Sequence, residues 1–590
     1  MTYRRIAAIL LVQGLVVACQ PGLICGAGTV EREGECVAAP VDGSTTVDAA
    51  TTDAGAGLDA ALDDGSVCAP ARCPSLLNAD AACDGDRCVY ACRTGYEDCD
   101  GTMENGCEAD LSVPETCGSC AQECPTAGHA IATCSARMCG LVCAEGWDDC
   151  DGNPLSGCES LLIDAYTCGA CGTSCSSTQI CSGGTCTAPP IARWAYTPPG
   201  GASNSARVIA LDDGGAIVVA VFSLVPYIAR LSSTGTTVWS RPINSVAAPH
   251  LNDIAVRGND IFVTGDHLGT TTFGPLTVTP PDTIQYHAFV ATLTMDGTWS
   301  WARSYGNAGV LHQGIALLTE PSGDLLVAVQ YGNGTDFGLG PLPSGTGTPP
   351  AGVQEGILRL TSTGDVTAQL GTTERSRGFQ SYARLAASPD GSIYFVGNGG
   401  MEVMIGTHTV GTRGLFLAKL DASLGVIWVQ DTGSVSAPAG LSALDDGVVL
   451  ALPAPGIGGF PVGAAGVPER AVVAYAGDGT PRWARTFGPE AYFDRAAVDA
   501  AGRVYVAMYR PFGGTPAGQL VVLNRDGNHL WSLRSSGSSS AYVNLTDVSI
   551  AASGRAVVAG LFTTDVYFAP FRLMPGDTFN HAFYVSFEPL

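Results

Sequence analysis

The chain has 590 residues, which at roughly 150 residues per domain allows about four domains, or fewer if one is a large all-β unit. Charged residues make only 14% of it and hydrophobic residues 46%, which argues against a coiled coil and against a highly charged disordered protein. The formal net charge is -26, and Lys419 is the only lysine. This excess of acids argues against nucleic-acid binding, because phosphates need Lys and Arg partners.

The amino terminus has the order of an export signal. Two arginines precede an apolar run of twelve residues that is too short to span a bilayer comfortably. The residues Val16-Val17-Ala18-Cys19 resemble a bacterial lipobox, which implies a signal peptide of residues 1–18 and a lipid anchor at Cys19. Gln20 in place of Asp favours the outer membrane or cell surface. A secretory signal with a chance cysteine is the alternative.

All 23 cysteines lie between Cys19 and Cys186, so the chain changes character at about residue 190. Cysteines this dense imply an oxidising compartment, with a cytosolic zinc protein as the alternative. Setting Cys19 aside leaves 22 thiols, enough for eleven disulfides of undetermined connectivity. We expect one local bridge between Cys25 and Cys36. The acid-rich remainder of residues 19–67 is predicted to be a disordered spacer.

Eight cysteines within residues 68–190 recur at a constant offset of 51 residues. The first copy and its repeat are Cys83, Cys88, Cys92, Cys99, Cys107, Cys117, Cys120 and Cys124, then Cys134, Cys139, Cys143, Cys150, Cys158, Cys168, Cys171 and Cys175. Each copy is predicted to be one small module held by about four disulfides, because it has few large apolar residues. Cys181 and Cys186 begin a truncated third copy.

The repeat spacing resembles that of Cys-rich repeats in surface lipoproteins of myxobacteria and related bacteria. The stretch CGACGTSCSSTQICSGGTC resembles the Stig1-type cysteine motif. The resemblance covers about residues 83–186 and implies no catalytic role. Zinc binding at the Cys-x2-Cys pairs is possible on spacing, but export favours disulfides.

Acidic residues in the two repeats form a candidate calcium site. Hard carboxylate oxygens are the ligands that calcium prefers. The candidates are Asp98, Asp100 and Glu108 in the first copy and Asp149, Asp151 and Glu159 in the second. Their spacing does not match the EF-hand loop, and turn-forming acids are the alternative reading, which we favour.

Residues 191–590 have the pattern of an all-β domain, with short apolar runs separated by Gly, Asp, Asn and Pro turns. Seven tight glycine turns, such as those in LDDGGAIVVA and SPDGSIYFVG, join the first two strands of seven predicted blades. A third apolar strand follows each pair, and in five blades a tryptophan strand follows the third, as in RLSSTGTTVWSRPI. This arithmetic predicts a seven-bladed β-propeller, with a β-sandwich or two smaller barrels as rivals.

The two ends of this region are predicted to complete one blade. The last blade ends at HAFYVSFEPL without a fourth strand, whereas IARWAYTPP supplies a tryptophan strand ahead of the first blade. We therefore expect Trp194 to lie beside the strand around Tyr584, which removes an exposed sheet edge. The third blade has VTAQLGT in place of a tryptophan strand and is the weakest assignment.

The blade pattern resembles that of bacterial seven-bladed propeller repeat proteins and, more loosely, of quinoprotein propellers with TG-x-x-x-W strands. The quinoprotein activity does not carry over, because the chain has seven predicted blades and no adjacent cysteine pair. Common hydrolase, nucleotide and dinucleotide motifs are absent. The eight histidines form no close cluster in the sequence, and Asp266 with His267 is the most distinctive polar pair.

The preferred reading is a non-enzymatic lipoprotein, anchored at the bacterial surface, whose propeller binds a protein or glycan partner. Long connections between the second and third strands of blades 2, 3 and 7 predict that the partner docks on that face. The alternatives are an extracytoplasmic polysaccharide hydrolase or lyase and a purely structural envelope component. Acids or histidines that converge on the propeller axis would favour the enzyme, and small apolar residues would favour binding.

Overall fold

The structure is a computed structural model that describes residues 68–588 apart from short gaps, the longest being 346–352, 375–382, 434–439 and 455–468. Ahead of residue 68 it describes only the strands β1 (Thr29–Arg32) and β2 (Glu35–Ala38), which pair as a hairpin. The predicted signal peptide, lipidated Cys19 and spacer lie outside the described residues, and so do the side chains of the predicted Cys25–Cys36 bridge. Within the described part, no helix has the length and apolar character needed to cross a membrane.

The chain forms two compact units, one of Met1–Thr94 with Asp100–Glu108 and one of Gly95–Cys99 with Ala109–Leu590. The cysteine-rich elements of both units are short hairpins and two single-turn 3-10 helices. They are η1 (Pro70–Arg72), β3 (Ala79–Asp84), β4 (Arg87–Cys92), β5 (Tyr96–Glu97), β6 (Ala109–Asp110), η2 (Pro114–Thr116), β7 (Ala130–Ser135), β8 (Met138–Cys143), β9 (Trp147–Asp148), β10 (Ser160–Leu161), β11 (Ile180–Ser182) and β12 (Thr185–Thr187).

Ten disulfides join all twenty described cysteines and correct the prediction of self-contained modules with four bridges each. Only two bridges close within each copy, and the others join a copy to its neighbour along the chain. The pairs are Cys68–Cys83, Cys73–Cys88, Cys92–Cys107, Cys99–Cys120, Cys117–Cys134, Cys124–Cys139, Cys143–Cys158, Cys150–Cys171, Cys168–Cys181 and Cys175–Cys186. The copies are therefore linked in series, because the bonded unit is offset from the repeated one.

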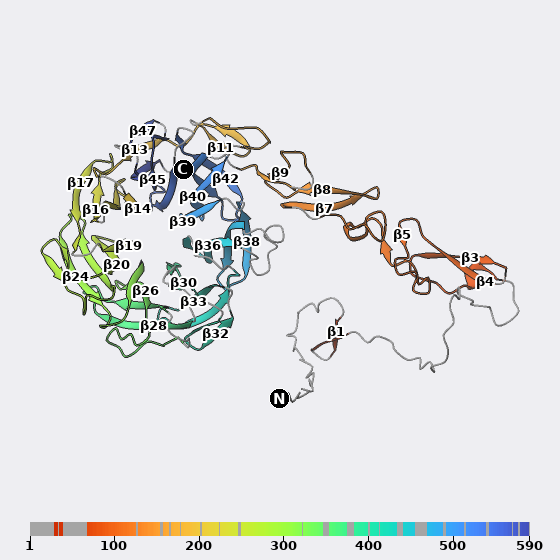
Figure 1. Cartoon of the computed structure of the whole chain (residues 1–590), viewed down its shortest axis with the longest axis horizontal. Helices are drawn as coiled ribbons and strands as arrows, with labels where there is room; N and C mark the ends of the chain where they lie inside the picture. Colours follow the sequence, from red (N-terminus) through yellow and green to blue (C-terminus); the bar gives the residue numbers. More distant parts are fainter. Residues whose placement is uncertain are drawn as a thin grey trace, which may run out of the picture. The chain divides into compact units, whose positions relative to one another are not determined.

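Seven four-stranded antiparallel sheets form a β-propeller, as predicted, and follow one another around a ring in Figure 1. Blades 1 to 4, each from the inner to the outer strand, are β14 (Ser203–Ala210), β15 (Ala216–Phe222), β16 (Val225–Leu231) and β17 (Thr237–Pro242); β19 (His250–Arg257), β20 (Asp260–His267), β23 (His287–Thr294) and β24 (Trp299–Tyr305); β25 (His312–Thr319), β26 (Leu325–Tyr331), β27 (Gln354–Leu360) and β28 (Val366–Glu374); and β29 (Arg384–Ala387), β30 (Ile393–Asn398), β33 (Leu415–Leu420) and β34 (Val426–Asp431).

Blades 5 and 6 follow the same order, and blade 7 takes its outer strand from the other end of the domain. They are β35 (Gly440–Leu444), β36 (Gly447–Ala454), β37 (Glu469–Ala476) and β38 (Pro481–Thr486); β39 (Tyr492–Val498), β40 (Val504–Phe512), β41 (Thr515–Leu523) and β42 (His529–Arg534); and β44 (Val543–Ile550), β45 (Ala556–Phe562), β48 (His581–Phe587) and β13 (Ala192–Tyr196). The apolar residues of facing strands are buried between successive blades, as in the cluster that joins Val219 of blade 1 to Val263 of blade 2.

The ring closes as the sequence predicts. Strand β13 pairs antiparallel with β48, and Trp194 and Tyr196 lie opposite Ser586 and Tyr584. Trp194 is 2% exposed, and its indole N–H donates to the carbonyl of Gly214 in blade 1 at 3.2 Å. The amino-terminal strand therefore completes the last sheet and also contacts the first one.

Five outer-strand tryptophans, one each in blades 1, 2, 4, 5 and 7, donate the indole N–H to a turn carbonyl of the next blade. Trp194 contacts the turn between the first and second strands there, and the others contact the turn between the third and fourth strands. Besides Trp194, these pairs are Trp239 with Met295, Trp301 with Ser362, Trp428 with Gly477 and Trp483 with Arg525, at 2.8–3.1 Å. Blade 3 lacks the tryptophan, yet its outer strand β28 is nine residues long and well paired.

Part of the long connections between second and third strands joins neighbouring blades. In blade 2 this connection contains β21 (Thr271–Phe273) and β22 (Leu276–Val278), and β21 pairs with β18 (Asn244–Ser245) after blade 1. In blade 4 the equivalent hairpin is β31 (Glu402–Ile405) with β32 (His408–Gly411), and its strand β31 pairs with β28 of blade 3. In blade 7 it is β46 (Val566–Phe568) with β47 (Phe571–Leu573), and its strand β46 pairs with β43 (Ser536–Gly537). These hairpins stabilise the ring, so the long connections are not all free for a ligand.

The truncated third copy of the repeat extends blade 6. Strand β11 pairs with β42, which makes a six-stranded sheet ordered β12-β11-β42-β41-β40-β39. The hydroxyl of Ser182 donates to the carbonyl of Leu530 at 3.2 Å, and that of Ser532 donates to the carbonyl of Ile163 at 2.7 Å. The disulfide-linked segment is therefore hydrogen-bonded to the propeller as well as joined to it by the chain.

We expect Trp194→Ala to lower the free energy of unfolding by about 3–5 kcal/mol, because it creates a cavity at the point of ring closure. Chemical denaturation of the oxidised chain measures this loss. The matched control is Trp301→Ala, a half-buried tryptophan with the same type of hydrogen bond inside the ring, for which we expect a smaller loss. Equal losses of unfolding free energy in the two variants would show that the tryptophan at the ring closure contributes no more to stability than one inside the ring.

Candidate functional site

The acids predicted as calcium ligands lie in turns of the disulfide-linked repeats. In the second copy, Glu159 Oε1 accepts the backbone N–H groups of Cys150 at 2.8 Å and Asp151 at 3.2 Å. Asp149 Oδ1 accepts the backbone N–H of Gly152 at 2.7 Å. These carboxylates thus act as acceptors within their own turn, which is the alternative role considered for them.

The first copy repeats part of this arrangement. Glu108 Oε1 accepts the backbone N–H of Asp100 at 3.1 Å, and Asp100 Oδ1 accepts that of Thr102 at 2.8 Å. Asp98 belongs to the other compact unit. Calcium binding by these six acids stays a prediction.

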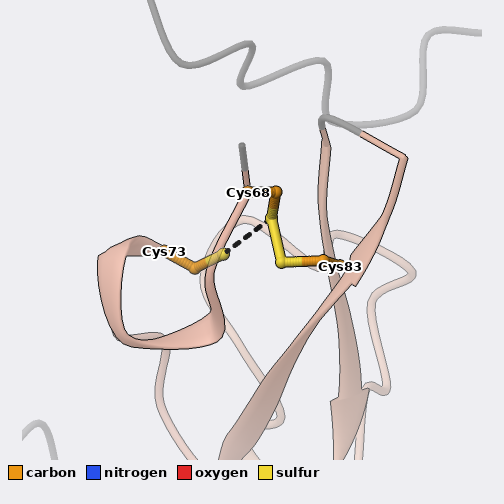
Figure 2. A group of neighbouring side chains, drawn as sticks. All are labelled: Cys68, Cys73 and Cys83. Atoms are coloured by element: carbon orange, nitrogen blue, oxygen red, sulfur yellow. Dashed lines mark hydrogen bonds between the residues drawn. A yellow bond between two sulfur atoms is a disulfide. The ribbon is translucent and has the colours of Figure 1, made fainter. Parts of the chain in front are cut away.

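Groups of three neighbouring sulfurs in the repeats have the spacing of a metal site but not its chemistry. Figure 2 shows one of them, in which Cys68 Sγ lies 4.0 Å from Cys73 Sγ and is bonded to Cys83. Cys73 is bonded in turn to Cys88. Because metal binding needs a thiolate, bonded sulfurs of this kind offer no zinc ligand, and the zinc alternative is wrong for the described cysteines.

The fold gathers histidines that are far apart in the sequence. His250, His267, His287 and His312 all stand at strand ends of blades 2 and 3, on the face where inner strands begin and where second and third strands connect. We call this the loop face. His267 is the register partner of His287, and the ring centroids of His287 and His312 are 5.4 Å apart. These histidines, which form no close cluster in the sequence, are therefore brought near one another by the fold.

Asp266 pairs with His250 and not with its sequence neighbour His267. Asp266 is 1% exposed, and its Oδ2 lies 2.7 Å from Nδ1 of His250. The His250 side chain is 56% exposed, so a buried carboxylate orients a solvent-facing imidazole. The hydrogen bond to Asp266 raises the pKa of His250, whereas burial lowers the pKa of His267 to about 4. A carboxylate that orients an accessible imidazole is an arrangement found in general bases.

Local backbone geometry explains why the dyad forms. The register between β19 and β20 shifts between Leu251 and Asp253, and this bulge sets His250 directly across from Asp266. Gly265 allows the strands to approach, because a Cβ there would overlap the carbonyl oxygen of His250. Asn252 Nδ2 then donates to Asp266 Oδ1 at 3.1 Å.

A ring of charged side chains surrounds the propeller axis at one level. Each ring position is four residues before the residue that opens the turn between the first and second strands of its blade. The positions are Arg207, Asp253, Ala316, Arg384, Gly440, Arg495 and Asp547. Five of the seven are charged, three as arginines and two as aspartates, and the neighbouring carboxyl of Asp494 interacts with Arg207 and Arg495. We call this level the axial ring.

The two aspartates of the axial ring are fully engaged. Arg495 Nη2 lies 3.0 Å from Asp253 Oδ1, and its Nε lies 3.6 Å from Asp547 Oδ1. Asp253 Oδ2 also accepts the backbone N–H of Leu317 at 2.9 Å, and Asp547 Oδ2 accepts that of Val208 at 3.0 Å. Each carboxylate therefore joins its blade to the next inner strand.

Arg384 has no such partner. Its Nη1 donates to the carbonyl of Ala383 at 2.9 Å, whereas its Nε is buried and has no hydrogen-bond acceptor. Its neighbours in the axial ring are Ala316 and Gly440, and no carboxylate among the described residues is paired with it. Burial and then the charge of Arg495 lower the pKa of Arg384 to about 9. A buried guanidinium in this state favours an anion.

A cavity of about 180 Å³ lies beside this guanidinium. Its polar lining comes from Arg384 and Arg495, from their ring partners Asp253 and Asp547, and from Ser549. The axial cavity is thus polar, and the Nε atoms of Arg384 and Arg495, two residues that line it, are buried without a hydrogen-bond acceptor in the described part of the chain.

Three tyrosines of blades 6 and 7 lie next to one another on the loop face. The rings of Tyr492 and Tyr509 are 5.8 Å apart, and those of Tyr509 and Tyr542 are 5.6 Å apart. Tyr492 is 49% exposed and lies three residues before Arg495 on the same inner strand. The Arg470 guanidinium is 4.8 Å from the centre of the Tyr492 ring. An aromatic surface therefore adjoins the route to the axial cavity.

The axial ring has a signal in the sequence, although it is not one of the common catalytic or binding motifs. Five of the seven inner strands carry a charge at the same distance before their turn, as Arg384 does in ARLAASPDG and Arg495 in DRAAVDAAG. A charge repeated at one register of an otherwise apolar strand predicts a shared level in a closed ring. His250 gave no comparable signal, since its partner is sixteen residues away.

No family model and no curated protein matches the sequence. Among solved structures, the chain is similar to the Pan2 WD40 domain of Neurospora crassa, with 10% identity and a TM-score of 0.39 over 70% of this chain and 96% of that one. It is also similar to an inactive virginiamycin B lyase from Staphylococcus aureus, with 10% identity and a TM-score of 0.39 over 67% and 98%. A Bacteroides caccae protein of unknown function shares 14% identity, with a TM-score of 0.31 over 52% and 89%.

The chain is accordingly a β-propeller protein with a disulfide-rich segment, as the seven sheets and ten disulfides define it. The low similarity to these structures carries no argument about its activity. Function must be inferred from the loop face and the axial ring.

We expect the His250 ring to titrate above the usual histidine pKa and the Asp266→Asn variant to bring it down. A raised pKa adds stability that is present at low pH and is lost as pH rises through the folded-state value. The effect on unfolding is small because His250 is largely exposed. Histidine NMR titration of the wild type and the variant measures the shift. An unchanged His250 pKa in Asp266→Asn would contradict the dyad.

The two arginines of the axial cavity should differ in their effect on stability. Arg495→Met leaves the largely buried Asp253 without its ion-pair partner and removes one of the cations beside Asp547, and we expect a loss of about 3–5 kcal/mol. Arg384→Met removes an unpaired buried charge, so stability should stay the same or rise. Chemical denaturation at neutral pH measures both. A large loss for Arg384→Met would mean that Arg384 has a structural partner.

Proposed function

We propose that the protein is an exported lipoprotein, anchored at the cell surface, whose propeller binds an acidic glycan at the channel mouth on its loop face. The observation that carries the ligand assignment is Arg384, a buried guanidinium without a carboxylate that faces the axial cavity. When a buried charged residue lowers stability and has no structural role, binding of a ligand best explains why the protein has it. A carboxylate or sulfate group supplies the missing partner.

The tyrosines at the channel mouth support a sugar as the carrier of that anion. The faces of Tyr492 and its neighbours are flat and amphipathic, which suits the apolar face of a pyranose ring. An acidic oligosaccharide places ring surfaces against the tyrosines while one charged group reaches Arg384. The guanidinium of Arg384, which has no ion-pair partner among the described residues, favours an anionic group over a neutral one at the cavity.

Surface anchoring rests on the sequence. The lipobox-like residues before Cys19 and the acidic spacer support an order of signal peptide, lipid anchor, spacer, Stig1-like repeats and propeller. The dense disulfides of the repeats agree with an oxidising compartment. Replacement of Cys19 by Ser should release the protein from the membrane fraction. Retention of Cys19→Ser in the membrane, or no incorporation of a labelled fatty acid into the wild type, would contradict the anchor.

Binding of a defined oligouronide tests the ligand. By isothermal titration calorimetry, we expect Arg384→Met to weaken binding at least tenfold, which is about 1.4 kcal/mol. Tyr492→Ala should weaken binding of the acidic oligosaccharide and of its neutral analogue to the same extent, because it removes only the contact with the sugar ring. The matched control is Arg303→Met, which removes the same charge from an exposed ion pair with Asp365 and should leave binding unchanged.

No binding of acidic glycans by the folded wild type would overturn the proposal. Binding of acidic proteins but not of acidic glycans would assign the site to a protein partner instead. The same titration with calcium and with a chelator tests the predicted calcium ligands of the repeats, independently of the propeller.

A hydrolase or lyase acting on an acidic polysaccharide is the second candidate. The His250–Asp266 dyad favours it, and so do Asp253 and Asp547, the acids at the axis that an enzyme was expected to have. His250 begins the inner strand that carries Asp253, so the imidazole stands at the mouth of the same channel. Such a histidine acts as a general base at neutral pH. Shortening of the oligouronide by wild type but not by His250→Gln would establish the enzyme. Stable binding without cleavage favours the non-enzymatic role.

A further inference from the structure

A second group of polar side chains lies on the loop face between blades 2 and 3. Asp282 is in the connection before β23, His287 is the first residue of β23, and His312 is the first residue of β25. Both histidines are 0% exposed, and the Asp282 side chain is 15% exposed. The backbone N–H of His312 donates to the carbonyl of Tyr286 at 2.8 Å, which holds the two segments together.

Three ring nitrogens in this group have no hydrogen-bond partner. They are Nδ1 and Nε2 of His287 and Nδ1 of His312. Leaving a buried polar atom unsatisfied destabilises a fold, so such atoms call for an explanation. The other two histidines nearby differ, because His267 contacts hydroxyl groups of Thr271 and Ser304 and His250 contacts Asp266.

The distances within the group match those between ligands of one metal ion. Asp282 Oδ1 lies 3.4 Å from His287 Nε2, longer than an ordinary hydrogen bond. Two donors about 2.05 Å from a tetrahedral ion are about 3.3 Å apart. The ring centroids of His287 and His312 are 5.4 Å apart, and two imidazoles on one such ion place theirs about 5 Å apart.

Hydrogen bonds around the group prepare it for a cation. His312 Nε2 lies 3.0 Å from Thr335 Oγ1, whose hydroxyl donates to the carbonyl of Gly332 at 2.8 Å. Because that hydroxyl proton is used, Thr335 accepts from Nε2–H, and Nδ1 of His312 keeps its lone pair. Backbone N–H groups, among them those of Ile284 and Gln285, fix the Asp282 carboxylate. Outer contacts of this kind orient metal ligands.

We propose that Asp282, His287 and His312 bind one divalent metal ion of the zinc class. Two imidazoles and one carboxylate are a ligand set for such an ion, with a fourth position left for water. The ion ties the connection before β23 to the inner strand of blade 3. It also steadies Tyr286, whose ring lies 5.5 Å from that of His250. The proposal is independent of the glycan site, which uses other residues.

The test uses Co²⁺ as a spectroscopic probe on the full oxidised chain after treatment with a chelator. We expect one equivalent to produce visible ligand-field bands of a low-coordinate ion, and Zn²⁺ to displace it and raise the melting temperature. His287→Gln and Asp282→Asn should each weaken Co²⁺ binding by about a hundredfold or more. The matched control is His250→Gln, which removes an exposed histidine of the same face and should bind as the wild type does.

Three outcomes overturn the proposal: no saturable Co²⁺ bands in the folded wild type, wild-type affinity in both ligand variants, or equal weakening by His250→Gln. If His287→Gln does not fold, the Co²⁺ affinity of Asp282→Asn decides between the outcomes. This variant changes a side chain that reaches the surface, so we expect it to fold. A thiol assay that detects no free cysteine excludes thiolate binding of the probe. Calcium, which prefers oxygen ligands, should not displace Co²⁺.

Discussion

The pairing of β13 with β48 is the contact on which the propeller depends. Without it, blade 7 would have three strands and an open edge, and blade 1 would lose the indole of Trp194 that contacts Gly214. Tryptophans in the outer strands of blades 1, 2, 4 and 5 donate a similar hydrogen bond to the next blade. Ring closure therefore combines a type of contact used at four other blade boundaries with a strand pairing that joins the two ends of the domain.

Covalent and non-covalent stabilisation meet at blade 6. The disulfide-linked repeats have little apolar material of their own, so bonds such as Cys168–Cys181 take the place of a core. That bond holds the hairpin whose strand β11 then pairs with β42. The pairing covers the outer edge of a blade that would otherwise expose unpaired backbone groups. The repeats thus protect the propeller edge while the propeller orients their last hairpin.

The loop face combines two uses of the same connections. Hairpins inserted after the second strands of blades 2, 4 and 7 pair with the preceding blade, which stiffens the ring. The inner strands beneath them carry charges that a purely structural channel does not need. Asp253 and Asp547 join neighbouring blades, whereas Arg384 lies between two small residues of the axial ring and, within the described residues, donates only to the carbonyl of the residue before it. Such a contrast among equivalent positions separates structural charge from functional charge.

The sequence by itself determined the blade count, the tryptophan strands, the pairing of Trp194 with the last sheet and the repeat of the cysteines, because each rests on a local pattern that recurs along the chain. Only the tertiary structure decided which cysteines bond, since each copy closes bridges with its neighbours as well as within itself. It alone also brought His250 to Asp266, His287 to His312 and Arg384 to the axial cavity. These groupings depend on which strand ends meet when the ring closes, and the spacing of residues in one dimension does not contain that information.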